Sequence, residues 1–204
     1  MIKIHLIRHG QTDWNATRRV QGQSESVLTP LGKQQAAALG REISQHNIDR
    51  AYCSSSVRAR ETAEQLFKYC NIQVEYLDDL REIHLGPWEG RLYAEIEVAS
   101  PEDYNHFWQQ PHLFSVDGAE TFLELQQRGM KVLTDICKHT QQMEVAIVSH
   151  GALIKSILCH YEGKHLSRLW DPPRLQNCAH NILQLDNQAN GKIIQYAETK
   201  IPLS

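Results

Sequence analysis

The sequence predicts an α/β fold in which helices cover both faces of a mostly parallel central sheet, a three-layer αβα arrangement. Two observations support this prediction. Short apolar runs alternate along the chain with longer segments whose apolar residues recur at helical spacing. No repeat, low-complexity tract or linker-like stretch divides the 204 residues. We therefore expect a single domain over residues 1–204.

The first third of the chain predicts two strands and two helices. Apolar residues dominate positions 2–7, which predict the first strand. Thr29 and Pro30 open a helix, as N-cap and first helical residue. A short strand follows near residues 51–53, and serines 54–56 are cap candidates for the second helix. Both helices have a buried stripe: Ala36, Leu39 and Ile43 in the first, and Ala59, Ala63, Leu66, Phe67 and Cys70 in the second.

The rest of the chain continues the alternation. In order, it predicts a strand at residues 74–77, a long helix at 118–139, a buried strand at 145–148, a helix at 152–161, and two late strands at 181–185 and 192–197. Residues 91–117 are rich in aromatic side chains and contain the helix breakers Pro101 and Pro111. We expect this segment to be a lid-like insert, although its aromatic residues could equally cover the core.

Composition excludes several classes of function. A net charge of −3 argues against general binding of nucleic acids or acidic membranes, which requires a basic surface. The five cysteines form no CxxC pair, so we expect buried, reduced thiols in a cytoplasmic protein. The apolar run at the N-terminus is too short for a secretory signal, and no stretch approaches the roughly 18 apolar residues of a membrane span. No pattern indicates the oligomeric state, and a homodimer is left open.

Two histidines follow predicted strands in the same way. Arg8-His9-Gly10 and Ser149-His150-Gly151 each come where a strand ends, and Arg58 lies in the first turn of the helix after another strand. Because ligands of α/β folds bind outside the carboxyl ends of the strands, these residues are expected to converge. A single histidine here is more often structural, but two with nearby arginines indicate a site. Arginine side chains and helix N-termini favour a phosphate group.

Other kinds of site are less compatible with the sequence. It contains no HExxH, HxH or cysteine cluster, and arginine beside the histidines would repel a metal cation. It also contains no GxxxxGK[ST] loop and no GxSxG elbow. We therefore expect neither a catalytic metal nor a cofactor. A late loop with Arg168, Trp170 and Arg174 could reach the site, but we expect it to be a surface loop.

Five ordered stretches resemble one known family, the phosphoglycerate mutase-like proteins of the histidine phosphatase superfamily. Residues 7–15 are similar to the family's RHG signature, and the likeness extends over most of the chain. The further stretches are Val20-Gln21-Gly22 with Leu28-Thr29-Pro30-Leu31-Gly32, residues 54–63, residues 80–90, and Val148-Ser149-His150-Gly151, with Asn177 in a plausible later position. The RHG run alone would be a weak motif, whereas the ordered set is specific.

The resemblance implies a role for each matching residue. His9 would be the nucleophile that becomes phosphorylated, and Glu82 would be the proton donor. Arg8, Arg58 and His150 would surround the phosphate. Substrate binding would be helped by Asn15, Gln21, Gly22 and Gly151. The spacing of acidic residues alone could not have selected Glu82.

The same site could serve several outcomes. Mutases of the superfamily usually carry Arg-His-Tyr-Gly after the catalytic Glu, whereas Glu82 is followed by Ile83-His84-Leu85-Gly86, which resembles the phosphatase-type members. The short aromatic insert gives no clear second anion site. We therefore expect a phosphatase that acts on a small phosphomonoester. A cofactor-dependent phosphoglycerate mutase and a non-catalytic module that binds phosphorylated ligands are the alternatives.

Overall fold

A central sheet organises the protein in the computed structural model, which describes residues 1–139, 143–197 and 199–200. Within these residues the strand order is β3-β2-β4-β1-β5-β6-β7. The strands are β1 (Ile2–Arg8), β2 (Ile48–Ser54), β3 (Val74–Leu77), β4 (Glu144–Ser149), β5 (His180–Leu185), β6 (Gly191–Tyr196) and β7 (Thr199–Lys200). The first four are parallel to one another, and β5, β6 and β7 extend the sheet by antiparallel pairing. The last four residues of the expected 1–204 domain lie outside the described part.

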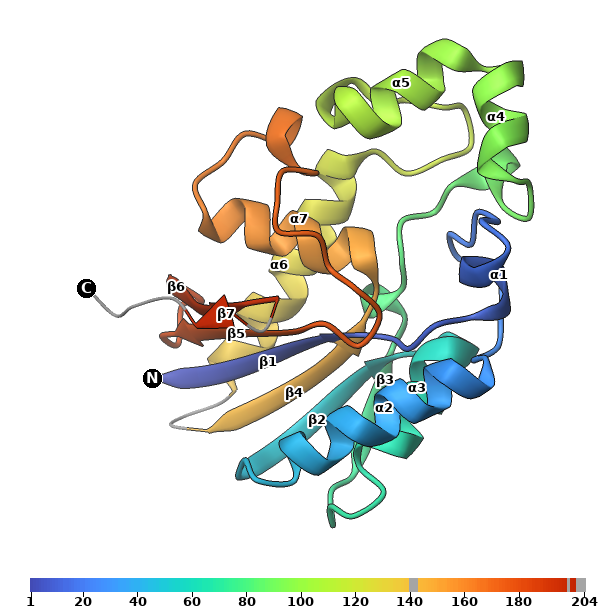
Figure 1. The fold of residues 1–204 in the computed structure, drawn as a ribbon. Helices are drawn as coiled ribbons and strands as arrows, with labels where there is room; N and C mark the ends of the chain where they lie inside the picture. Colours follow the sequence, from blue (N-terminus) through green and yellow to red (C-terminus); the bar gives the residue numbers. More distant parts are fainter. Residues whose placement is uncertain (140–142, 198, 201–204) are drawn as a thin grey trace.

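Helices cover both faces of the sheet, which confirms the predicted three-layer α/β fold (Figure 1). On one face, α2 (Pro30–Ile43) and α3 (Val57–Leu66) pack an apolar cluster with Ile7 and Val148. The opposite face carries α6 (Phe122–Lys138) and α7 (Gly151–Tyr161), which enclose the larger core cluster. No helix of the described residues is long and apolar enough to cross a membrane.

Helix boundaries follow the cap residues. The Thr29 hydroxyl accepts the Gly32 amide at the start of α2, as predicted. The long helix begins at Phe122, four residues later than expected, because Thr121 and Glu124 form a capping box there. The second predicted helix ends at Leu66, so its stripe is shorter than we expected. Ser56 is the N-cap of α3, but its side chain makes no capping bond.

The insert at residues 91–117 is helical. It forms α4 (Tyr93–Ala99), α5 (Pro101–Gln109) and the 3₁₀ turn η3 (Pro111–Leu113), which stand beyond the carboxyl ends of the parallel strands together with the short α1 (Asp13–Ala16) (Figure 1). Phe114 is buried against Trp88 and Phe122, so part of the aromatic content does cover the core. Other 3₁₀ turns are η1 (Asp78–Leu80), η2 (Gly86–Trp88) and η4 (Leu166–Arg168).

The cysteines behave as buried thiols. The structure forms no disulfide among the five, and all except Cys70 are buried. Burial raises the pKa of Cys137 to about 11, so this thiol stays protonated at neutral pH. No cysteine lies among the residues that line the cavity described below.

Candidate active site

The two predicted histidines meet where β1 and β4 end side by side. Arg8 is in register with Ser149 in the parallel pair, so the residues that follow them leave the sheet together. The ring centroids of His9 and His150 are 5.1 Å apart, with planes inclined by 60°. Arg58 reaches the same place from the first turn of α3 and donates from Nε to His150 Nδ1 at 3.2 Å. The expected convergence of the three segments therefore occurs.

His9 has the protonation state that a nucleophile requires. Its Nδ1–H donates to the Gly10 carbonyl at 2.8 Å, which leaves the lone pair on Nε2. Burial, and then the positive charges of Arg58 and Arg8, hold the pKa of His9 well below its usual 6.5. The ring lines the cavity and is 2% exposed. The imidazole is thus neutral at physiological pH and fixed in one tautomer.

Arg58 supplies a buried positive charge to the cavity. Its Nη1 and Nη2 donate to the carbonyls of Ser24 and Gly22 at 2.9 and 2.7 Å, in addition to the Nε bond to His150. Burial lowers its pKa to about 10, so the guanidinium stays charged at neutral pH. These bonds use three of the five N–H groups, which leaves two for a ligand.

His150 stands behind His9 instead of lining the cavity. It is fully buried, accepts from Arg58 on Nδ1 and therefore donates from Nε2 to the Ser54 hydroxyl at 2.8 Å. The Ser56 hydroxyl also lies 3.3 Å from Nε2. Both ring nitrogens are thus engaged by protein groups. His150 thus contacts His9 and Arg58, two of the predicted catalytic side chains, and its hydrogen bond holds Arg58 in position.

Arg8 retains a donor for an anion. Its Nη1 donates to the Leu175 carbonyl at 2.6 Å, whereas Nε is buried and has no partner among the described residues. Gly151 lies directly beside this atom: a Cβ there would be 3.3 Å from Arg8 Nε. A side chain at this position would therefore crowd the Arg8 guanidinium, and the glycine at the start of α7 avoids this.

Glu82 lines the same cavity and is held by the N-terminus of α7. Its carboxylate accepts the backbone N–H groups of Ala152 at 3.0 Å and Leu153 at 3.1 Å, and that of Ile83 at 3.0 Å. The positive end of a helix dipole favours a carboxylate in this place. Family resemblance alone selected Glu82, and the structure brings it to the cavity wall that also includes His9, Arg8 and Arg58.

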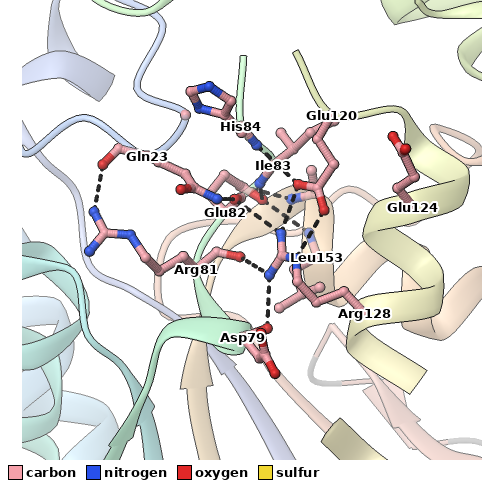
Figure 2. Close-up of polar contacts among 12 residues, drawn as sticks. Gln23, Asp79, Arg81, Glu82, Ile83, His84, Glu120, Glu124, Arg128 and Leu153 are labelled. Carbon is pink, nitrogen blue, oxygen red and sulfur yellow. Dashed lines mark hydrogen bonds and ion pairs between the residues drawn. The ribbon is translucent and has the colours of Figure 1, made fainter. Parts of the chain in front are cut away.

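The segment that carries Glu82 is fixed by Arg128 of α6, a residue that sequence reasoning missed (Figure 2). Arg128 donates to the carbonyls of Asp79 and Arg81, both at 2.8 Å, and to that of Glu82 at 3.3 Å. Its Nε and Nη2 form a two-point ion pair with Glu120, at 2.9 and 2.8 Å. The sequence predicted the long helix that carries Arg128 but not its role, because hydrogen bonds to backbone carbonyls do not show in the spacing of residues.

The remaining predicted substrate-binding residues line the cavity as well. The Asn15 side-chain oxygen accepts the Thr12 amide and the Asn177 side-chain NH₂ group, at 3.2 and 3.1 Å. Gln21 uses its oxygen to accept the hydroxyls of Thr12 and Ser26, at 2.9 and 2.6 Å, so its NH₂ group can face an anion. Gly22 has a φ of +52°, which favours glycine and presents its carbonyl to Arg58.

Aromatic side chains form the outer wall of a cavity of about 820 Å³. Tyr93, Tyr104, Phe107 and Trp108 of the insert line it, as does Trp170. The Trp108 and Trp170 rings are 5.4 Å apart, and Trp108 Nε1 is buried without a partner among the described residues. The insert therefore contributes both to the core and to the cavity.

The late loop differs from our expectation of a surface loop. Trp170, Asp171 and Arg174 line the cavity, whereas Arg168, which pairs with Asp171, does not. Lys155 anchors the loop, since its Nζ donates to the carbonyls of Asp171 and Pro173 at 2.6 and 3.1 Å. Arg18 and Arg19 also line the cavity. The cavity is thus lined by positively charged side chains in addition to Arg8 and Arg58, and none of them belongs to the insert at residues 91–117.

Comparison with known proteins places the chain in one family. Residues 4–197 match the family model of the histidine phosphatase superfamily (branch 1). The chain belongs to this superfamily. A metal-independent phosphoserine phosphatase of Arabidopsis thaliana is 32% identical over 189 residues, which cover 91% of this chain and 77% of the relative. A probable phosphoglycerate mutase, GpmB, of Serratia proteamaculans is 32% identical over 216 residues, which cover 97% and 93%.

A solved structure agrees with this assignment. YhfR of Bacillus stearothermophilus matches this histidine phosphatase with a TM-score of 0.92 at 35% identity, covering 99% of this chain and 98% of the other. The family and the phosphatase among the relatives confirm the prediction of a phosphoric monoester hydrolase as the enzyme class. The homodimer, the cytoplasmic location and the absence of a catalytic metal or cofactor stay predictions.

Proposed function

We propose that this histidine phosphatase hydrolyses small phosphomonoesters without a metal, through a phosphohistidine on His9, with Glu82 as general acid and base. One observation carries the proposal. A neutral imidazole with its lone pair on Nε2 shares a cavity wall with two arginines and a carboxylate. Transfer of a phosphoryl group to a side chain requires a nucleophile, donors that bind the anion, and an acid–base group. The cavity wall contains all three.

Each residue has a step in this mechanism. His9 Nε2 attacks phosphorus, and Arg8 and Arg58 stabilise the negative charge on the equatorial oxygens. Glu82 in its acid form protonates the leaving alkoxide, and the resulting carboxylate then removes a proton from the water that attacks phospho-His9. An acid–base step of this kind contributes about 10²–10⁴-fold to the rate. His150 acts through Arg58 as a positioning residue, as its hydrogen bond to Nε indicates.

The cavity supports a narrower class of substrate. Arg18 and Arg174 are exposed arginines that line it outside the phosphate-binding residues. A phosphomonoester whose leaving group carries a carboxylate would place a second negative charge near these side chains. The names of the relatives, a phosphoserine phosphatase and a probable phosphoglycerate mutase, refer to compounds of this kind. We therefore propose phosphoserine and 3-phosphoglycerate as the first substrates to test.

The test measures phosphate release in the presence of a chelator. Wild type and His9→Ala are compared on phosphoserine, 3-phosphoglycerate, a sugar phosphate and p-nitrophenyl phosphate. We expect release by the wild type alone. A parallel reaction supplies 3-phosphoglycerate with and without 2,3-bisphosphoglycerate. Interconversion of the phosphoglycerate isomers without net release of phosphate would show that the enzyme is a mutase and not a phosphatase. Tight binding of the phosphorylated compounds with no release from any of them would support the non-catalytic alternative.

A matched pair of variants tests the second anion site. Arg174→Gln removes a cation that lines the cavity, whereas Arg41→Gln removes an exposed cation of α2 that does not line it. We expect Arg174→Gln to raise KM for phosphoserine and to leave KM for p-nitrophenyl phosphate unchanged, because only the former carries a carboxylate. Equal effects of the two variants on both substrates would reject this substrate class while leaving the phosphatase assignment intact.

A further inference from the structure

A second group of histidines lies on β1, away from the cavity. His5 lies within β1, four residues before His9, which directly follows the strand; four residues span about 13 Å at the usual strand rise. His46 follows the end of α2, and Glu144 begins β4. None of the three lines the active-site cavity. The proposed phosphatase chemistry uses none of them, so their convergence calls for a separate explanation.

The polar atoms of this group come close together. Glu144 Oε2 lies 3.1 Å from His5 Nε2 and 3.4 Å from His46 Nδ1. One ligand atom from each residue lies within 4.8 Å of the other two. The rings of His5 and His46 meet edge to face, with centroids 4.7 Å apart. Two imidazoles therefore share one carboxylate oxygen at separations close to those between ligands of a bound metal ion.

We propose that His5, His46 and Glu144 form a binding site for a divalent transition-metal ion of the zinc type. Two imidazole nitrogens and one carboxylate oxygen are a donor set that Zn²⁺ accepts. With bonds of about 2.0–2.1 Å, the ligand atoms of a tetrahedral Zn²⁺ are about 3.3–3.4 Å apart. The separation of 3.4 Å between Glu144 and His46 matches this range, and that of 3.1 Å between Glu144 and His5 is slightly shorter. The two imidazole nitrogens lie within 4.8 Å of each other, so they would move closer together on binding the ion.

The outer contacts of the group suit metal binding. His180 Nε2 lies 2.9 Å from His5 Nδ1, and Lys3 pairs with the other carboxylate oxygen of Glu144. Metal-bound histidines usually donate their second N–H to such a partner, and metal-bound carboxylates are hydrogen-bonded in turn. Without metal, the His5 Nε2–H donates to Glu144. With metal, Nε2 binds the ion and the His5 proton resides on Nδ1. His180 then accepts this proton's hydrogen bond on Nε2 and carries its own proton on Nδ1, which faces the Gln195 side-chain amide.

Exposure provides a route for the ion. The side chains of His46 and Glu144 are 33% and 24% exposed, whereas that of His5 is fully buried. An ion would enter from the solvent side, and water would complete its coordination there. Such an ion would join β1, β4 and the end of α2.

The test uses Zn²⁺ on the intact, metal-stripped protein. Because His46 is partly exposed at a helix end, His46→Gln should fold, and equal circular dichroism spectra verify this. The control is His112→Gln, which removes an exposed member of another histidine pair, His112 with His165. Equilibrium dialysis and titration calorimetry measure the stoichiometry and affinity, and the absorption spectrum with Co²⁺ reports the coordination geometry.

The proposal predicts one tight Zn²⁺ per chain, a tetrahedral Co²⁺ spectrum, and at least about 100-fold weaker binding in His46→Gln, more than the loss of an outer-shell partner typically causes. His112→Gln should bind as the wild type does. The proposal is overturned if the wild type binds no Zn²⁺, or if His46→Gln binds it as tightly as the wild type. Metal affinity is the readout, so the result does not depend on the phosphatase assignment.

Discussion

The two histidine groups on β1 place the same side chain in opposite electrostatic surroundings. At the carboxyl end of the strand, His9 and His150 lie beside Arg8 and Arg58, and no carboxylate of the described residues hydrogen-bonds to either ring. Earlier on the strand, His5 faces a carboxylate, that of Glu144. Cations around a neutral imidazole favour an anionic ligand, whereas a carboxylate favours a cation. The neighbours of a histidine, more than the strand that carries it, therefore determine its chemistry.

The largest expected contrast between the groups is in turnover. His9→Ala removes the nucleophile and should reduce kcat for phosphomonoesters by at least about 10⁴-fold, to the level left by binding and charge stabilisation alone. His46→Gln alters the other group and should leave kcat unchanged. Steady-state phosphate release measures both. Comparable losses in the two variants would mean that the histidine groups do not work independently.

The next largest effect is expected from Arg58, the positive charge beside His150 at the carboxyl ends of the parallel strands. Arg58→Ala removes the buried guanidinium that faces the cavity and should lower kcat/KM by about 10²–10³-fold, as loss of one fixed donor to a transition-state oxyanion does. Arg58→Lys keeps the charge but not the bonds to His150, Ser24 and Gly22, so we expect partial recovery. Lys3→Ala, at the Glu144 group, is the matched control and should not affect kcat/KM. A fully active Arg58→Ala enzyme would contradict the assigned phosphate site.

Arg128 should have a smaller effect, because it acts through the Glu82 segment. Arg128→Ala frees three carbonyls of residues 79–82, and we expect kcat to fall about 10–100-fold with little change in KM. The fall should be weaker with p-nitrophenyl phosphate, whose leaving group needs no proton. Lys131→Ala, an exposed change on the same helix, is the control. A uniform loss over all substrates would indicate a purely structural role for Arg128.

Stability against acid tests both groups at once, because their buried histidines take up protons only when the chain unfolds. Burial holds the pKa of His9 and His150 well below 6.5, that of His5 at about 4 and that of His180 at about 3. The unfolded chain then binds more protons than the folded one below pH 6.5. The free energy of unfolding should therefore fall as pH drops from 6.5 towards 4, by up to about 1.4 kcal/mol per pH unit for each such histidine.

Urea unfolding of the metal-stripped protein between pH 7 and pH 4 measures this slope. A free energy of unfolding that is flat over this range would contradict neutral, buried histidines within and directly after β1.

Sequence patterns predicted the parts of the molecule that depend on local chemistry. The strand before His9, the cap at Thr29 and the convergence of the two His-Gly turns follow from residues close together in the chain. Contacts that join distant residues could not be read in the same way. Arg128 donates to three backbone carbonyls of the Glu82 segment. Trp170 lies at the cavity because Lys155 anchors its loop by donating to two other backbone carbonyls. His5, His46 and Glu144 have no recognisable spacing, so their meeting appears only in the fold.

Trapping of the phosphoenzyme tests the central claim most directly. Wild type, His9→Ala and Glu82→Gln are mixed with ³²P-labelled phosphomonoester, quenched in alkaline detergent, and the labelled peptide is identified. We predict an alkali-stable, acid-labile label on His9, more of it in Glu82→Gln when the leaving group is p-nitrophenolate, and none in His9→Ala. Phosphate release by the wild type with no label on His9, or with the label on another residue, would contradict the account.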